Sequence, residues 1–400
     1  MAQRVSALVD EAKAAIAACD GGALVAAALR GPHWRYAWVW AVGKAARAMA
    51  RDTGGGFVVD TTRAGHPVPD ERSVACAEQL LSAARAVPAD ERALLLLSGG
   101  ASALVGAPVE GLTLDELVAA TRVLMNGGAS IHELNVVRRH LTRLGGGKLA
   151  AACPGAIDVL ALSDVAGDGE AEPGESPSAR LHATIGSGPA SPEPATRAEA
   201  LAIARRYGVA DAALRVLEHV DENPRADHPA FARGTYRVLA SPETLRDAAC
   251  RVLAASGRRV RTWPSLVAGD VDDFAVDLAT QARALQPHEA IVAVGEPTVR
   301  VRAGGLGGRA QHLALSMVAP LSSSPARFLA LGSDGRDGPT DAAGALVDGR
   351  TLQRMAARGI DAADALERCD SYHALAAVGA TIPRFDSGTN LTDLYILEAA

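Results

Sequence analysis

Residues 37–44 read AWVWAVGK, an apolar run that ends at a glycine and a lysine. The run Ala37–Val42 is apolar at every position, which is typical of a strand buried on both faces of a parallel sheet. Ala93–Leu97 and Ile157–Leu162 largely share this pattern, and a serine follows each of them. Longer helical patterns separate the three runs, as in strands joined by crossover helices. The sequence therefore predicts an α/β fold with a mostly parallel sheet.

Capping boxes mark three helix starts. In such a box a Ser or Thr hydroxyl accepts a hydrogen bond from the third amide of the helix, and a Glu at that position reaches back. The three pairs are Thr113 with Glu116, Ser130 with Glu133, and Thr196 with Glu199. The first 20 residues carry regularly spaced charges and lack the apolar centre of a signal peptide, so we expect an amphipathic helix there.

A second set of apolar runs indicates a second α/β unit. The predicted strands of this unit are Tyr236–Leu239, Val260–Thr262, Ala290–Val294 and Phe328–Leu331. The polar, proline-containing segment 217–232 has no clear period, so we divide the chain there into domains 1–225 and 226–400. Residues 167–178 are too polar to pack, and we expect a flexible loop.

The composition excludes several classes of function. Of the 400 residues, 48% are hydrophobic, 22% charged and 4% aromatic, and the net charge is −6. An acidic chain with few aromatic residues is a poor nucleic-acid binder and a poor ligand for anionic membranes. The five cysteines form no CxxC pair, which favours a reducing cytoplasm. We therefore expect a cytoplasmic enzyme with a small-molecule substrate.

Polar residues follow each predicted strand of the first half, where open α/β sheets bind ligands. Lys44 stands at a strand-to-helix turn, which suits an anion. The turn that follows the second strand contains Ser98, Gly99, Gly100 and Ser102, and its glycines let amides approach a carboxylate or phosphate. A surface lysine at a helix start and an ordinary turn remain the alternatives.

Carboxylates follow the third strand. Asp164, with Asp168 four residues on, can hold Mg²⁺ or take a proton from an attacking hydroxyl. A simple helix cap is the alternative interpretation of Asp164.

The predicted helix from Ile131 carries two residues that suit a ligand. Asn135 and Arg138 are three apart and share a helix face, and Lys148 follows the glycines that end this helix. A solvated basic face would explain the same pattern.

The second half contains two glycine-rich loops with charged residues. Glu296 and Thr298 precede Gly304–Arg309, whose amides and guanidinium suit a polyanion, although no Walker motif occurs. The later loop 332–341 carries Asp334, Asp337 and Asp341, which suits a metal or substrate loop as well as a rigid turn. The histidines show neither HExxH nor another paired spacing, so we assign no transition metal.

Taken together and in this order, the motifs resemble the glycerate 2-kinase family, often mislabelled hydroxypyruvate reductase, whose C-terminal domain is called MOFRL. The resemblance spans nearly the whole chain. The motifs that carry it are Val42–Ala46, Ala64–Asp70, Ser98–Leu104, Ile131–Arg138, Gly146–Ala150, Ser163–Val165, Ser187–Pro189, Gly307–Arg309 and Asp337–Gly344.

The resemblance implies two α/β domains, the first Rossmann-like, with the active site in a cleft between them. It implies ATP and Mg²⁺ as co-substrates and phosphoryl transfer to the 2-hydroxyl of D-glycerate. Lys44, Asp164 and Arg309 are the expected catalytic residues, and Asp164 and Asp168 the expected metal ligands. The expected substrate and phosphate ligands are Ser98, Gly99, Gly100, Ser102, Asn135, Arg138 and Lys148. The expected ATP-binding residues are Glu296, Thr298, Gly305, Gly307, Gly308, Asp334, Asp337, Asp341 and Asn390.

The sequence departs from the family beside Arg309, where Ala310 and His312 replace the usual Asn and Glu. A kinase for another hydroxy acid or polyol, and a sensor that lacks catalysis, are therefore alternatives. A hydroxypyruvate reductase is weakly supported, because the turn at Lys44 lacks the dinucleotide glycines. A homodimer is one assembly that we consider.

Overall fold

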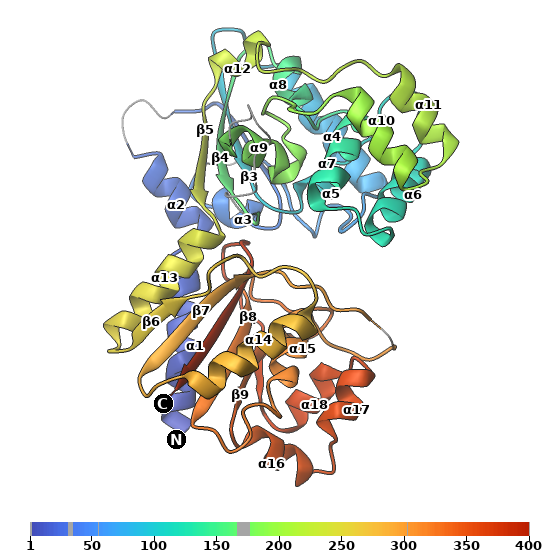
Figure 1. Cartoon of the computed structure of the whole chain (residues 1–400). Helices are drawn as coiled ribbons and strands as arrows, with labels where there is room; N and C mark the ends of the chain where they lie inside the picture. The colour runs from blue at the N-terminus through green and yellow to red at the C-terminus, as the bar shows by residue number, and fades with distance from the viewer. Residues whose placement is uncertain (1, 31–34, 55, 166–176, 302, 400) are drawn as a thin grey trace. The chain divides into compact units, whose positions relative to one another are not determined.

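The structure is a computed structural model that describes residues 2–30, 35–54, 56–165, 177–301 and 303–399 (Figure 1). The chain forms two compact units. The first is Gly21–Ser241, and the second combines Met1–Asp20 with Pro242–Ala400. No described helix is long and apolar enough to span a membrane.

The described part of the first unit contains a five-stranded sheet in the order β2-β1-β3-β4-β5, with every neighbouring pair parallel. Its strands are β1 (Trp38–Val42), β2 (Phe57–Val59), β3 (Arg92–Leu97), β4 (Ala156–Leu162) and β5 (Tyr236–Ala240). Residues of β3 and β4 are almost entirely buried, as expected for central strands covered on both faces. The predicted α/β class and the parallel sheet are confirmed.

The described helices of this unit are α2 (Gly21–Ala28), α3 (Ala46–Met49), α4 (Glu71–Arg85), α5 (Ala101–Leu104), α6 (Leu114–Asn126), α7 (Ile131–Leu141), α8 (Lys148–Ala152), α9 (Pro177–Thr184), η1 (Ile185–Ser187), α10 (Arg197–Arg206), α11 (Asp211–His219) and α12 (Pro229–Arg233). Four of them, α4, α6, α7 and α10, begin at capping boxes. The three predicted capping boxes are confirmed at α6, α7 and α10. A fourth box, Asp70 with Ser73, starts α4 and was missed because Ser takes the place of Glu.

The strand order positions the candidate site. From β1 the chain moves to β2 on one side of the sheet and then to β3 on the other. Ligands of open α/β sheets bind at such a switch point, outside the carboxyl ends of the two strands. In this chain the residues at that place are those after Val42 and after Leu97.

The second unit is built on a mixed sheet in the order β10-β9-β8-β11-β7-β6, in which the pair β6–β7 is parallel and the other pairs are antiparallel. Its strands are β6 (Arg259–Thr262), β7 (Glu289–Gly295), β8 (Ala326–Gly332), β9 (Ala342–Asp348), β10 (Thr381–Pro383) and β11 (Asp393–Ala399). Its helices are α1 (Ala2–Ala17), α13 (Pro242–Ala255), α14 (Val271–Ala284), α15 (Arg309–Ser316), α16 (Thr351–Ala356), α17 (Ala362–Glu367) and α18 (Ser371–Ala377).

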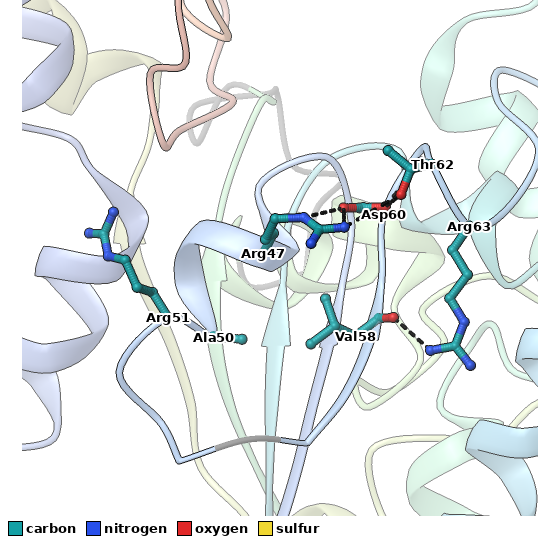
Figure 2. A pocket seen from close by; sticks show the side chains of 7 residues that line it. All are labelled: Arg47, Ala50, Arg51, Val58, Asp60, Thr62 and Arg63. Carbon is teal, nitrogen blue, oxygen red and sulfur yellow. Dashed lines mark hydrogen bonds and ion pairs between the residues drawn. The ribbon is translucent and has the colours of Figure 1, made fainter.

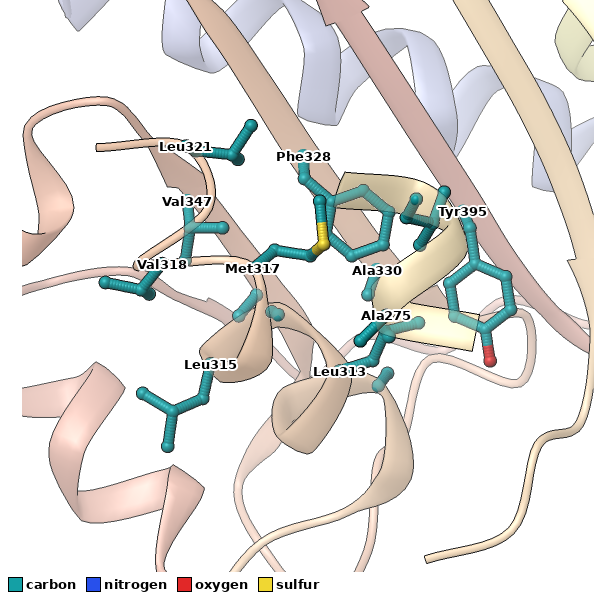
Figure 3. Close-up of a cluster of buried hydrophobic side chains, with 14 of the residues drawn as sticks. Ala275, Leu313, Leu315, Met317, Val318, Leu321, Phe328, Ala330, Val347 and Tyr395 are labelled. Carbon is teal, nitrogen blue, oxygen red and sulfur yellow. The ribbon is translucent and has the colours of Figure 1, made fainter. Parts of the chain in front are cut away.

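The core of the second unit lies between the sheet and the helices α14 and α15 (Figure 3). Leu313 on α15 and Ala275 on α14 face Phe328 and Tyr395 from neighbouring strands. The two aromatic rings are stacked with centroids 6.4 Å apart, and both side chains are fully buried. This packing fixes α15, and with it Arg309, at one end of the sheet.

Two segments join a different unit from the one that the boundary at residue 225 implies. Tyr236–Ala240, which we expected in the second unit, pairs in parallel with β4 in the first sheet. The helix α1 packs against α13, and Glu11 on α1 pairs with Arg258 at 2.9 Å. Both outcomes depend on contacts between residues that are far apart in the sequence, and no local sequence pattern predicts such contacts.

Candidate active site

The turns after β1 and β3 interlock around Gly43. This glycine has a φ of 133°, and a Cβ atom there would lie 2.1 Å from Ser98 Oγ and 2.5 Å from Ser98 O. The buried Ser98 hydroxyl accepts a hydrogen bond from the Ala45 amide (3.1 Å), and the Lys44 amide donates to Gly99 O (2.9 Å). The Ser98 side chain therefore stabilises the turn that carries Lys44.

Replacing Gly43 with alanine is expected to lower the free energy of unfolding by about 2 to 3 kcal/mol, because both the positive φ and the contact with the Ser98 backbone oppose a side chain. The control is Gly208→Ala, which shares a positive φ (70°) but has no atom within 4 Å of the added Cβ. That variant should lose about 1 kcal/mol. Urea unfolding compares the two variants, and equal losses would contradict the close approach.

A group of donor side chains gathers at the switch point. Lys44 Cγ and His66 Nε2 lie 3.3 and 3.2 Å from the position that a Cβ atom on Gly100 would take. Ser187 Oγ lies 2.7 Å from Ser102 Oγ and 3.3 Å from Asn135 Oδ1. We call these residues, with one more on α7, the switch-point cluster: Lys44, His66, Ser102, Asn135, Arg138 and Ser187.

The cluster is cationic, and no carboxylate among the described residues acts on the pKa of His66 or Arg138. Burial lowers the pKa of Arg138 to about 10. The His66 side chain is exposed overall, yet partial desolvation of its ring, followed by the charges of Lys44 and Arg138, lowers its pKa to about 4, so the ring is neutral at pH 7. Within the described part of the chain, no carboxylate contributes to either shift, and the side chains of Lys44 and Arg138 have no hydrogen-bond partner. Such uncompensated positive charge suits an anionic ligand.

Two members of the cluster were not among the predicted ligands. Both lie in motifs that carry the family resemblance, His66 in Ala64–Asp70 and Ser187 in Ser187–Pro189. Nothing in the sequence favoured these two residues as ligands over the others in the same motifs. Ser187 has a φ of 62°, between two glycines that also have positive φ. Non-glycine residues in this region are strained and gather at functional sites, but no sequence pattern reveals the strain.

Lys148 lies in an internal network. Its ammonium donates to Arg139 O and to Asn223 Oδ1, both at 2.6 Å. Burial lowers the Lys148 pKa to about 7. The buried Arg139 guanidinium pairs with Glu193 through two bonds of 2.5 and 2.7 Å. The acceptors that the structure gives Lys148 are thus protein groups, and its role as a ligand stays a prediction.

The predicted magnesium ligands are only partly described. Asp164 directly follows Ser163 at the carboxyl end of β4 and is half-buried. Asp168 lies outside the described residues. In the described ranges, no group of three or more His, Cys, Asp or Glu side chains is arranged to hold a metal ion. The magnesium site therefore stays a prediction.

In the second unit, Arg309 is held by two carboxylates. Its Nε lies 2.6 Å from Asp393 Oδ2, and its Nη2 lies 2.7 Å from Glu296 Oε1. Burial opposes the charge of Arg309, but Asp393 and Glu296 outweigh it and raise the Arg309 pKa. The guanidinium plane is thereby fixed across the ends of β7 and β11.

Asp337 occupies the start of α15, where we expected amides free for a phosphate. It accepts from the amides of Ala310 (3.1 Å) and Gln311 (2.7 Å). Burial and the charge of Asp393 raise the Asp337 pKa to about 6. A bound phosphate would have to compete with this carboxylate for these two amides.

The remaining residues expected to bind ATP also make contacts within this unit. The Thr298 hydroxyl donates to Gly269 O, Asp341 accepts from the Tyr372 hydroxyl, and Asp334 accepts from the Arg336 amide. Asn390 is buried and has a partner. A Cβ atom at Gly305, Gly307 or Gly308 would lie 2.3 Å or less from a neighbouring atom, so these glycines allow close packing. The cleft shared by Lys44 and Arg309 stays a prediction.

A cavity of about 520 Å³ lies beside α3 and the segment after β2 (Figure 2). Three arginines line it, but each already has a protein partner. Arg47 Nε lies 3.0 Å from Asp60 Oδ2, and Arg63 donates to Val58 O at 2.9 Å. Unlike the switch-point cluster, this cavity holds guanidinium groups that the protein has already paired.

A doubly wound sheet with a cationic cluster at its switch point defines an α/β protein suited to a small anionic ligand. Residues 7–221 match the family described as a domain of unknown function, DUF4147, and residues 289–393 match the MOFRL family. A glycerate 2-kinase of Pyrococcus horikoshii is 33% identical, over 90% of this chain and 86% of its own length. A D-glycerate 2-kinase of Thermotoga maritima is 34% identical, over 83% and 78%. The chain therefore belongs to the glycerate 2-kinase family, as the resemblance predicted.

The fold of a solved relative agrees. The crystal structure of a glycerate kinase from Thermotoga maritima superimposes with a TM-score of 0.84 at 29% identity and covers all of both chains. Two relatives from Agrobacterium vitis carry the name of a hydroxypyruvate reductase. Both names thus occur within one family.

Proposed function

We propose that this protein transfers the γ-phosphoryl group of ATP to the 2-hydroxyl of D-glycerate. The observation that carries the proposal is the switch-point cluster, a set of donors without a carboxylate at the place where open α/β sheets bind ligands. Membership of the glycerate 2-kinase family supports the same activity.

The residues of the cluster suit the parts of such a substrate. Arg138 and Asn135 share a face of α7 and offer donors to the substrate carboxylate. Lys44 supplies a charge for the acceptor or the transferring phosphoryl. Arg309 is the second catalytic cation in this proposal, and it neutralises charge as the phosphoryl moves.

Magnesium is part of the proposal. Asp164 and Asp168 would hold it, because carboxylate oxygens are its preferred protein ligands. When bound, the ion would neutralise charge on the phosphates of ATP. Residues of the second unit, among them Glu296 and Thr298, are the proposed nucleotide ligands.

An assay separates the kinase from a reductase. Purified protein with D-glycerate, ATP and Mg²⁺ is expected to form ADP and 2-phosphoglycerate, whereas hydroxypyruvate with NADH or NADPH should give no enzyme-dependent loss of absorbance. The physical reason is the turn after β1, where Lys44 stands in place of the glycines that a dinucleotide pyrophosphate needs. Product identity is checked by phosphorus NMR. Robust nicotinamide oxidation would overturn the proposal.

The departures from the family pattern beside Arg309, at Ala310 and His312, raise the question of which acceptor substrate the protein uses. Ala310 is fully buried, and His312 is nearly buried with Nε2 3.6 Å from Asp272. Both side chains therefore pack within their own unit, which gives no specific support to a different acceptor. A panel of hydroxy acids and polyols in the same assay tests this point.

A further inference from the structure

His66 is the titratable member of the switch-point cluster. Its ring lies against the turn that follows β3, with Nε2 and Cδ2 both 3.2 Å from the position of a Cβ atom on Gly100. The stem of Lys44 approaches the same point at 3.3 Å. Because Gly100 has no side chain, the ring and the lysine stem share the space above this turn.

Two cations act on His66 from different elements. Lys44 belongs to the turn after β1, and Arg138 belongs to α7. The turn at Gly100, which packs against the ring, contributes no charged side chain. Across the described ranges, neither ring nitrogen of His66 has a hydrogen-bond partner. The imidazole is thus neutral and able to accept a hydrogen bond.

An anion would complement the charge around these three side chains. A carboxylate placed between Lys44 and Arg138 would offset the charge that now opposes protonation of the ring. The ligand class that fits is a short hydroxy acid, whose carboxylate pairs with the cations while its hydroxyl reaches the ring.

We propose that His66 accepts the proton of the reacting hydroxyl while the carboxylate of the same substrate lies between Lys44 and Arg138. This inference rests on the proposed glycerate kinase function. The hydroxyl oxygen forms a bond to the γ-phosphorus of ATP, and the bond from that phosphorus to the β,γ-bridging oxygen breaks. ADP leaves with the electron pair. The hydroxyl proton passes to an imidazole nitrogen and then to water.

The arrangement couples binding to proton transfer. In the free protein the ring has a pKa of about 4 and holds a proton poorly. Once the carboxylate is bound, one of the two opposing charges is offset and the ring pKa rises, although desolvation, the largest cause of the shift, still lowers it. The acid limb of kcat, which reports the substrate complex, is therefore expected at higher pH than the acid limb of kcat/KM, which reports the free enzyme.

NMR titration of the histidine rings tests the coupling without catalysis. The signal of His66 is identified by its absence in the His66→Asn variant. Without ligand the ring should stay neutral from pH 5 to 8, and with saturating D-glycerate its midpoint should rise by about one unit or more. Glycerol, which has the hydroxyls but no carboxylate, should leave the midpoint unchanged.

Kinetics test the role of the ring in turnover. His66→Asn and His66→Gln are expected to lower kcat by about 10²-fold and to remove its acid limb. The matched control is His219→Asn, which changes an exposed histidine at the end of α11 and should leave kcat unchanged. Circular dichroism checks that the His66 variants fold, and a folded variant with normal kcat overturns the role.

The outcomes separate this inference from the proposed function. Calorimetry that detects no glycerate binding would overturn both. Binding with no change in the His66 midpoint would overturn the coupling alone, and phosphoryl transfer would then need another proton acceptor such as Asp164.

Discussion

Replacement of Lys44 by alanine is expected to lower kcat by about 10²- to 10³-fold and to leave the unfolding midpoint nearly unchanged. The side chain is exposed, and its ammonium has no partner among the described residues, so folding loses little when it is removed. A fixed positive charge that faces developing negative charge contributes to turnover instead. Steady-state kinetics with D-glycerate and ATP, together with urea unfolding, measures both effects.

Two further variants make this result specific. Lys44→Arg keeps the charge but changes its shape, so it should recover only part of the activity. Arg85→Ala removes an exposed cation from the last turn of α4 and should change neither quantity. Normal turnover in Lys44→Ala would remove Lys44 from the proposed catalytic residues.

The second large effect is expected for Arg309→Lys, which should lower kcat by about 10²-fold or more and also destabilise the fold. A planar guanidinium bridges Asp393 and Glu296, and one ammonium cannot reproduce that two-pronged geometry. Asp393 is buried, so weakening its partner is expected to cost about 1 to 3 kcal/mol. Kinetics and urea unfolding again measure the two effects.

The control for Arg309 is its more exposed partner. Glu296→Gln removes a carboxylate that is 43% exposed, and the stability change should stay below about 1 kcal/mol. Full activity and stability in Arg309→Lys would show that charge alone matters at this position. The two cations thus have distinct expected signatures, because Lys44 is unpaired in the described structure and Arg309 is paired.

Local patterns in the sequence determined most of the first sheet. The apolar runs at β1, β3 and β4 and the hydroxyl–glutamate pairs at α6, α7 and α10 are each encoded within a few residues. For the same reason, the position of Lys44 and Ser98 directly after strands was readable from the sequence. The motif order further predicted the family, to which the chain indeed belongs.

The tertiary structure decided what each polar group contacts. β11 was missed because its sequence DLYILEA places Asp393 and Glu398 in an otherwise apolar strand, and both are buried beside arginines from distant segments. The Ser98 hydroxyl was expected to face a ligand, but it accepts a hydrogen bond from the amide of Ala45, which lies 53 positions earlier in the sequence.

Lys148 and Asp337 were expected at ligand sites, but they make hydrogen bonds to protein groups. His66 became a candidate functional residue only in the tertiary structure, which places Lys44 and Arg138 near its ring. Strand period and helix capping are properties of neighbouring residues. The partner and the pKa of a polar group depend on residues that only folding brings together.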